Sequence, residues 1–389
     1  MLKGFRTKLD LNNKLATVMA RHAGYARWVW NWGLALWSEA YKEGLKHNAN
    51  KLKKLFTNHV KPTYGWMSEV SSRVYQYAFI NLGEAHTRFF KKLGDKPVFK
   101  KKILHDSFTV DNCGKPIRLG GLKHKLPFIG CVKTYEPLPE CVTKKVTISR
   151  EADSWYISFT FEYEPVIAQP IVGVVGVDLG INALATLSTG VVFPSLKPYR
   201  QAKQQLARMQ RQLSRKVKGS KNRNKARIKL ARKHSQVANI RRDYLHKITT
   251  YIAKNHSTVV IEDLNVSSMM ANHKLAAAIA DMGFYEFHRQ LEYKCQWYGT
   301  SLLTVDRFYP STKLCSGCGH KQDMPLKARQ YDCPNCNLSL NRDLNASINL
   351  SNQGRLALGS LPRDSRSHAP VEVESKPRYD VLCGDVSVL

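Results

Sequence analysis

Four cysteines in the C-terminal part of the chain have the spacing of a metal site. Cys315 and Cys318 form one Cys-x-x-Cys pair, Cys333 and Cys336 form another, and fourteen residues separate the pairs. Zn²⁺ prefers four tetrahedral ligands, and each pair offers two thiolates from one tight turn. The sequence therefore predicts a structural zinc ribbon. His320 is not expected to bind, because four cysteines already complete the coordination.

Three carboxylates stand where apolar strands end or a helix begins. Asp178 ends the apolar run "IVGVVGVD", Glu262 ends "TVVIE", and Asp343 lies at the start of a helix expected after the ribbon. A carboxylate at the end of a buried strand is costly unless it is paired or holds a metal. If the two strands are neighbours in one sheet, the three acids converge and need a divalent cation. Oxygen ligands favour Mg²⁺ or Mn²⁺, and such ions promote phosphodiester hydrolysis.

Each of these acids also has an ordinary interpretation. Asp178 fits a turn, Glu262 fits an ordinary acid at a strand end, and Asp343 fits the N-cap of its helix. Asp263 and Asp306 are the nearest competitors for the same role. Spacing along the chain does not exclude either of them.

The charge of the chain indicates a polyanionic partner. Against 30 Asp and Glu there are 61 Lys and Arg, which gives a formal net charge of +31. Binding to a membrane surface is the alternative, but the sequence shows no apolar signal core and no run of membrane-spanning length. We therefore expect nucleic acid as the partner and no membrane.

The positive charge is concentrated in one segment. Residues 200–243 hold sixteen Lys or Arg and one acidic residue, on a pattern that predicts a basic helical hairpin over 200–248. Such a run is often only a solvated face, but like charges this dense repel unless a partner neutralises them. The side chains expected to contact nucleic-acid phosphates are Arg208, Arg211, Arg215, Lys216, Lys218, Lys221, Arg223, Lys225 and Arg227.

The remaining pattern predicts a multidomain chain of α/β and α+β type. A strand at 1–10 is followed by helical spacing over 12–93, where Trp28, Trp30 and Trp32 are read as core aromatics rather than base-stacking residues. Strand-like alternation follows over 105–165, ending in a hairpin. Nine cysteines with no exported context indicate reduced thiols in a cytoplasm.

Four stretches together closely resemble the TnpB family of transposon-encoded proteins, which are related to type V CRISPR effectors. They are "GVDLGINALAT", "VVIEDLNV", "FYPSTKLCSGCG" and "CPNCNLSLNRDLNASINL". The resemblance implies an RNase H-like (RuvC) nuclease core with an inserted zinc ribbon, preceded by a β-barrel wedge domain that carries a helical insert. The implied domains are the wedge at 1–11 and 104–170, a helical recognition domain at 12–103, the nuclease at 171–312 and 338–352, the ribbon at 313–337, and a disordered tail at 353–389.

The same resemblance implies a function. The expected protein is a transposon-associated, RNA-guided DNA endonuclease that cuts double-stranded target DNA beside a short flanking motif. Asp178, Glu262 and Asp343 are its implied catalytic residues and Mg²⁺ ligands. One chain is expected for each guide RNA, which comes from the transposon end, in the nucleoid-associated cytoplasm of a bacterium or archaeon.

Two other functions compete with this interpretation. A nuclease-inactive RNA-guided DNA-binding protein, or a transposition accessory factor, would not need all three acids, and all three are present. An autonomous transposase with a tyrosine nucleophile would need a paired-histidine motif, which the sequence lacks near its tyrosines. One departure from the family concerns Asn341, where an aspartate is common, and we expect it to act as a helix cap.

Overall fold

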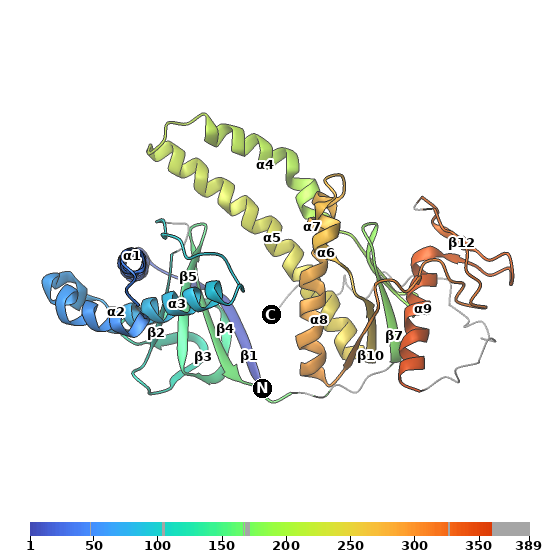
Figure 1. Ribbon diagram of the computed structural model, residues 1–389, viewed down its shortest axis with the longest axis horizontal. Helices are drawn as coiled ribbons and strands as arrows, with labels where there is room; N and C mark the ends of the chain where they lie inside the picture. The colour runs from blue at the N-terminus through green and yellow to red at the C-terminus, as the bar shows by residue number, and fades with distance from the viewer. Residues whose placement is uncertain (47, 103–105, 166, 168–171, 326, 360–389) are drawn as a thin grey trace. The chain divides into compact units, whose positions relative to one another are not determined.

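The computed structural model describes residues 1–359, except 47, 103–105, 166, 168–171 and 326. The chain divides into two compact units, residues 1–164 and the residues from 165 onward. In Figure 1 the first unit is blue to green, and the second is green to red. Among the described helices, none has the length and apolar character needed to cross a membrane. The predicted tail lies, from residue 360 on, outside the described residues.

The first unit is an antiparallel sheet with helices packed on it. Its strands are β1 (Leu2–Asp10), β2 (Ser107–Asp111), β3 (Ile117–Leu126), β4 (Gly130–Thr143), β5 (Lys145–Glu151) and β6 (Ser154–Glu162), in the order β2-β5-β6-β1-β4-β3. Its helices are α1 (Asn13–Lys42), α2 (Ala49–Leu55) and α3 (Ser72–Phe90), with a π-helical turn (Phe56–Val60) and two 3-10 turns (Lys61–Thr63, Gly65–Glu69). The predicted hairpin is β5–β6. Closure of the sheet into a barrel stays a prediction, because β2 and β3 are its outer strands.

The helices and strands of the first unit share one hydrophobic core. Met19 and Phe79 of the helices join Val110 and Ile157 of the strands in a single buried cluster. Trp30 is buried, while Trp28 and Trp32 are half-buried and pack against Phe56, as expected of core aromatics. The division of this unit into a wedge and a recognition domain therefore remains a proposal.

The second unit is built on a mixed five-stranded sheet. Its strands β7 (Val172–Leu179), β8 (Ala183–Leu187), β9 (Val192–Pro194), β10 (His256–Glu262) and β11 (Ser301–Val305) have the order β11-β10-β7-β8-β9. Strands β7, β10 and β11 are parallel, and β8 is antiparallel to both β7 and β9. The condition set for convergence of the acids is met, because the two apolar strands β7 and β10 pair directly.

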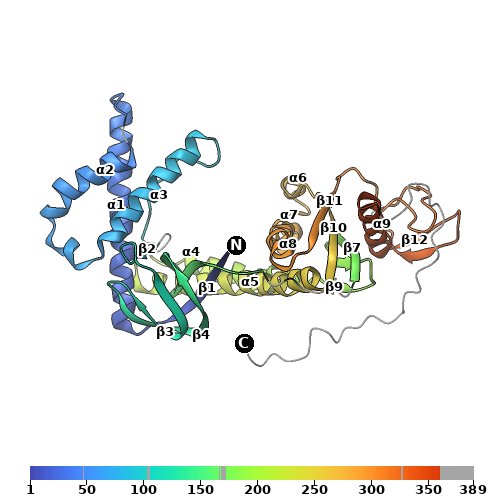
Figure 2. The same cartoon turned by 90° about the horizontal axis from the view of Figure 1, so that it is seen from below.

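Helices cover both faces of this sheet. They are α4 (Pro198–Ser214), α5 (Lys221–Asn255), α6 (Val266–Ala271), α7 (Ala276–Met282), α8 (Phe284–Tyr298) and α9 (Arg342–Ala357), and a small hairpin of β12 (Gln330–Asp332) and β13 (Ser339–Asn341) precedes α9. Figures 1 and 2 both show α9 on one side of β7 and β10, with α8 on the other. Alternate strand residues accordingly face different helices. On the face toward α5 and α8, Leu245 and Leu291 of these helices are buried together with residues of β7 and β10. These strand residues are Val175, Val177, Val259 and Ile261.

Helix α9 approaches the sheet closely at two glycines. A Cβ atom on Gly176 of β7 would lie 1.9 Å from the Ser347 carbonyl oxygen and 2.5 Å from the Ser351 nitrogen. A Cβ atom on Gly354 would lie 2.3 Å from Val260 Cγ2. Only hydrogen fits at these positions, so the backbone of α9 lies directly on β7. The strand residues that face α9 are therefore Gly176 and those in phase with it.

Two helices extend beyond the predicted boundaries. Helix α5 ends at Asn255 rather than 248, because Ile248, Ile252 and Ala253 continue its buried face into the core. Helix α9 ends at Ala357, so the predicted tail boundary after 352 is wrong. Gly354 packs against the sheet within that extra turn.

Replacing Gly176 with alanine should push α9 away from β7. Overpacking of this kind costs about 1–3 kcal/mol, so thermal unfolding should show a matching loss in the free energy of unfolding. Gly173→Ala is a matched control on the same strand, since its nearest atom outside the chain neighbours is Ser257 Oγ at 4.0 Å. Equal stability of the two variants would contradict the close approach.

Candidate functional site

Strand phase and register place Asp178 and Glu262 together. Val177 pairs with Ile261 between the parallel strands β7 and β10, so Asp178 and Glu262 occupy the next positions at the carboxyl ends of both strands. Asp178 is in phase with Gly176, which faces α9, and Glu262 is in phase with Val260, which contacts Gly354 of α9. Both carboxylates therefore point toward the side of the sheet that α9 covers.

The charges of Asp343 and Glu262 act on Asp178. Burial, followed by repulsion from Asp343 and Glu262, raises the pKa of Asp178 to about 7, and only Arg342 opposes this shift. The pKa of Glu262 is raised by burial and by the adjacent Asp263. Asp178 thus lies within range of the charges of both Asp343 and Glu262. Such a donor set fits a divalent cation with a preference for oxygen ligands, because the cation would remove the repulsion.

The two competing aspartates have other partners. Asp263 accepts hydrogen bonds from the Arg307 guanidinium, including one of 3.0 Å from Nε, and forms an ion pair with it. Asp306 Oδ1 accepts a 2.7 Å hydrogen bond from the Phe308 nitrogen and so closes a turn. Both side chains serve the loop after β11.

Asn341 is the N-cap of α9, as predicted from the sequence. Its Oδ1 accepts hydrogen bonds from the nitrogens of Asp343 at 2.9 Å and Leu344 at 3.3 Å. The alternative interpretation of Asp343 as the cap is therefore wrong, because Asp343 lies inside the first turn. Its carboxylate remains available to the acidic cluster and lies 3.8 Å from Arg342 Nε. Arg342 was not anticipated, although its position beside an acid was a signal.

The four predicted cysteines form one cluster. Their sulfur atoms all lie within 4.8 Å of one another, with 3.5 Å between Cys315 and Cys336 and 3.6 Å between Cys318 and Cys333. Tetrahedral Zn²⁺ with Zn–S bonds of about 2.3 Å requires sulfur separations of roughly 3.8 Å. The cluster is therefore compatible with structural zinc. His320 contributes its main-chain carbonyl, which accepts from the Cys315 nitrogen.

Two asparagines of α9 fasten this ribbon to the helix. Asn345 Oδ1 accepts a 2.9 Å hydrogen bond from the nitrogen of Ser316, which lies between the first two cysteines. Its Nδ2 donates to the Leu314 carbonyl at 2.6 Å. Asn349, one turn later, donates to the carbonyls of Ser311 and Leu314, each at 2.8 Å. The metal-site turn and the helix that carries Asp343 are thus directly bonded. Sequence reasoning missed both asparagines, whose only signal was their spacing of four residues along the expected helix.

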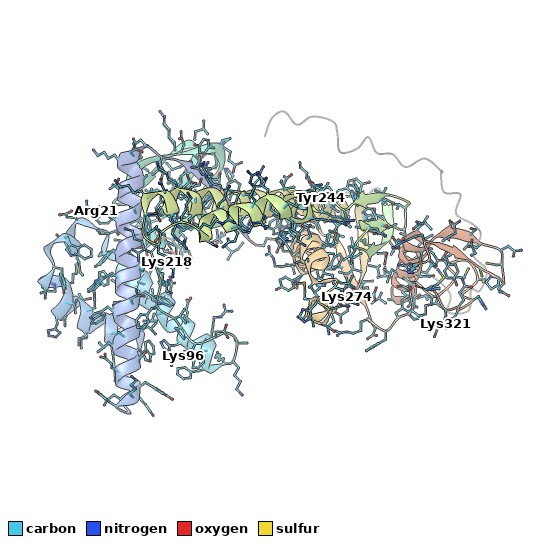
Figure 3. The ribbon with its side chains drawn as sticks, turned by 90° about the horizontal axis from the view of Figure 1, so that it is seen from above. Arg21, Lys96, Lys218, Tyr244, Lys274 and Lys321 are labelled. Carbon is cyan, nitrogen blue, oxygen red and sulfur yellow. The ribbon has the colours of Figure 1, made fainter. Side chains whose placement is uncertain are left out.

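The basic hairpin consists of α4 and α5, packed on each other through a small core. Ala202, Leu206, Leu230 and Val237 are buried between them. The predicted cations at its exposed positions are Arg208, Arg211, Arg215, Lys216, Lys218, Lys221 and Lys225. Figure 3 labels Lys218 in the turn that joins the helices. Arg227 is half-buried.

Arg223 has a structural contact that the sequence did not indicate. It is half-buried, and its Nη1 donates to the carbonyls of Leu213 at 2.9 Å and Lys216 at 2.8 Å. These bonds fix the end of α4 against the start of α5. Its predicted role in phosphate contact is therefore weaker than that of its exposed neighbours.

Comparisons with known families and structures agree with this architecture. Residues 158–273 match the family described as "Probable transposase" (OrfB_IS605), residues 284–350 match the "Cas12f1-like, TNB domain", and residues 1–46 match a "Helix-turn-helix domain" of the OrfB type. In this structure residues 1–46 contain one strand and one long helix. A solved Cas12f1–sgRNA–target DNA complex has a chain of similar fold, with a TM-score of 0.55, 15% identity, and coverage of 89% of this chain and 84% of that one.

Curated relatives are similar over most of their length. "Putative RNA-guided DNA endonuclease InsQ" of Escherichia coli K12 is 35% identical, over 94% of this chain and 96% of the relative. A "Putative RNA-guided DNA endonuclease" of Streptomyces pristinaespiralis is 38% identical, over 75% of this chain and 74% of the relative. The fold is thus that of the Cas12f-like proteins. The chain belongs to the TnpB (OrfB) family of transposon-encoded proteins.

The raised pKa of Asp178 predicts a pH-dependent stability. An unfolded aspartate has a pKa near 3.9, and Asp178 in the folded chain titrates at about 7. Ionisation of Asp178 therefore lowers the free energy of unfolding. This loss is absent below about pH 4 and reaches its full size above about pH 7. Without added Mg²⁺, Asp178→Asn should gain stability over the parent as pH rises from 5 to 8. About 2 kcal/mol is expected, since solvent screens this part-exposed group.

Thermal unfolding of both proteins across this pH range measures the effect. Adding Mg²⁺ at pH 8 should raise the unfolding temperature of the parent more than that of Asp178→Asn. A stability difference that does not change between pH 5 and pH 8 would contradict repulsion at this carboxylate.

Removing one cysteine ligand should release the zinc. Elemental analysis should find about one zinc per parent chain and much less in Cys315→Ser, because three thiolates bind more weakly than four. Cys113→Ser is the control, since Cys113 is exposed in the first unit and should not change the zinc content. Full zinc retention by Cys315→Ser would count against the ribbon assignment.

Proposed function

We propose that this protein is a transposon-associated, RNA-guided DNA endonuclease. The observation that carries the proposal is the buried Asp178 carboxylate on β7, whose pKa is raised by burial and by the charges of Asp343 at the start of α9 and Glu262 at the end of β10. The names of the relatives, and the chain's membership of their family, support the choice of substrate. The mixed sheet supports the finer assignment of an RNase H-like (RuvC) core.

Asp178, Glu262 and Asp343 would hold Mg²⁺, or Mn²⁺, through their carboxylate oxygens. The bound ions supply activation of water and stabilisation of the leaving oxygen in phosphodiester hydrolysis. The chain itself contributes the placement of these oxygens. Parallel pairing fixes Asp178 beside Glu262, Asn341 sets the first turn of α9, and Arg342 limits the repulsion.

The exposed cations of the hairpin would hold the guide RNA and its duplex with the target strand. Contacts of Lys and Arg with phosphates are salt-sensitive and largely independent of sequence. Base pairing with the guide would therefore select the target, while the protein reads only a short flanking motif on double-stranded DNA. We propose one chain per guide RNA, which comes from the transposon end.

A protein that binds DNA under RNA guidance without cutting it is the remaining candidate. Loss of an acid would favour that function, and each of the three positions carries its acid. The nuclease is therefore preferred.

Asp178→Ala separates cleavage from binding. With guide RNA, Mg²⁺ and plasmid carrying a matched target, cleavage should fall by roughly 10³-fold or more, because an oxygen ligand is lost. Affinity for the guide RNA should stay unchanged, since the exposed hairpin cations are untouched. Asn341→Asp is the control, because aspartate also caps a helix and cleavage should persist. Cleavage at the parent rate by Asp178→Ala would exclude this acid from the site.

A further inference from the structure

The loop after β11 has a well-defined conformation beside the acidic cluster. Its first turn is closed by the Asp306 carbonyl, which accepts a 3.0 Å hydrogen bond from Tyr309, and by the Asp306 side chain, which binds the Phe308 nitrogen. Arg307 pairs with Asp263, the residue directly after Glu262. These bonds tie the loop to the end of the strand that carries one of the acids.

The loop directs its two aromatic rings differently. Tyr309 is half-buried, and burial raises the pKa of its hydroxyl. Phe308 points outward and is 85% exposed, the largest exposure of any bulky hydrophobic side chain among the residues that the structure describes. The hydrogen bonds described above hold this loop in place, yet the phenyl ring of Phe308 packs against little of the protein. Packing within the chain therefore does not explain why a phenylalanine stands at this position.

Phe308 and Glu262 line the same groove. It has a volume of about 390 Å³, and cationic side chains share its walls with these two residues. The cations are Arg307, Lys313 and Lys321; the first two also form ion pairs, Arg307 with Asp263 and Lys313 with Asp323. Figure 3 labels Lys321, which belongs to the predicted zinc ribbon.

An aromatic face bordered by cations suits single-stranded nucleic acid. Bases stack on exposed rings, and Lys or Arg side chains accompany the phosphates. Paired bases in a duplex already stack on one another, so their faces are covered. Glu262 lines this groove, so a strand bound in it would lie beside one of the three acids.

We propose that Phe308 stacks on a base of the DNA strand being cut and so positions that strand's phosphate at the acids. Lys313 and Lys321 contact the neighbouring phosphates. Phe308 is thus a positioning residue for the nuclease reaction. This inference depends on the proposed endonuclease function, and it identifies single-stranded DNA as the form bound at the site.

Single-turnover cleavage by the full-length, guide-loaded protein tests the proposal. Phe308→Ala should slow cleavage of a matched target by about 5- to 100-fold, the range expected for loss of one stacked base. Phe308→Tyr should restore it, because a ring remains. Tyr285→Ala removes a ring that is 70% exposed on α8 and should cleave like the parent. Cleavage by Phe308→Ala within about twofold of the parent would overturn the proposal.

A second readout does not depend on cleavage. In the Asp178→Ala background, 2-aminopurine is placed at single positions of the target strand near the cut. Its fluorescence should be quenched at the position where the base stacks on Phe308. Phe308→Ala should then fluoresce more strongly than Phe308→Tyr at one position. Equal fluorescence would refute stacking, and weaker guide RNA loading by Phe308→Ala would indicate an RNA contact instead, which also overturns the proposal.

Failure of the proposed function gives a different result. The parent protein would then leave a matched target uncut in the presence of guide RNA and Mg²⁺. The same fluorescence measurement on a short single-stranded oligonucleotide would still report whether Phe308 stacks on DNA. The two failures are therefore distinguishable.

Discussion

The direct contact between the backbone of α9 and strand β7 is the constraint on which the acidic cluster depends. Gly176 and Gly354 remove the side chains that would hold helix and sheet apart. At a usual separation, the start of α9 would lie farther from the strand ends, and Asp343 would not act on Asp178. Close packing at these two glycines thus helps to place Asp343 near Asp178, whose pKa is raised first by burial and then by repulsion from Asp343 and Glu262.

Local spacing predicted much of this structure. Cysteine pairs at fixed intervals are a short-range pattern, so the cluster of Cys315 and its partners followed from it. Apolar runs ending in acids indicated two buried strands, but the direct pairing of β7 with β10 is seen only in the structure. The sequence did not show whether Glu262 or Asp263 belongs to the acidic site, because adjacent strand residues differ only in the face of the sheet to which they point. That choice required the phase set by α9. The roles of Asn345, Arg223 and Arg342 depend on contacts between segments, which no local pattern contains.

Helix α5 serves two environments along one continuous backbone. Its first half carries exposed cations, while its last turns bury Ile248, Ile252 and Ala253 in the core. A helix of 35 residues extends about 52 Å at 1.5 Å per residue. The positive charge of the hairpin is therefore fixed to the sheet by a helix without a break, and no flexible linker intervenes.

The order of the strands also explains where the chain tolerates additional structure. Each acid terminates a strand or begins a helix at the same edge of the sheet, so the path between two acids leaves that edge and returns to it. The basic hairpin occupies the interval from Asp178 to Glu262, and the cysteine ribbon occupies the interval from Glu262 to Asp343. Because loop length adds little closure entropy, either interval can lengthen or shorten during evolution without moving the acids. The sheet thus acts as a fixed frame that accepts exchangeable accessory modules.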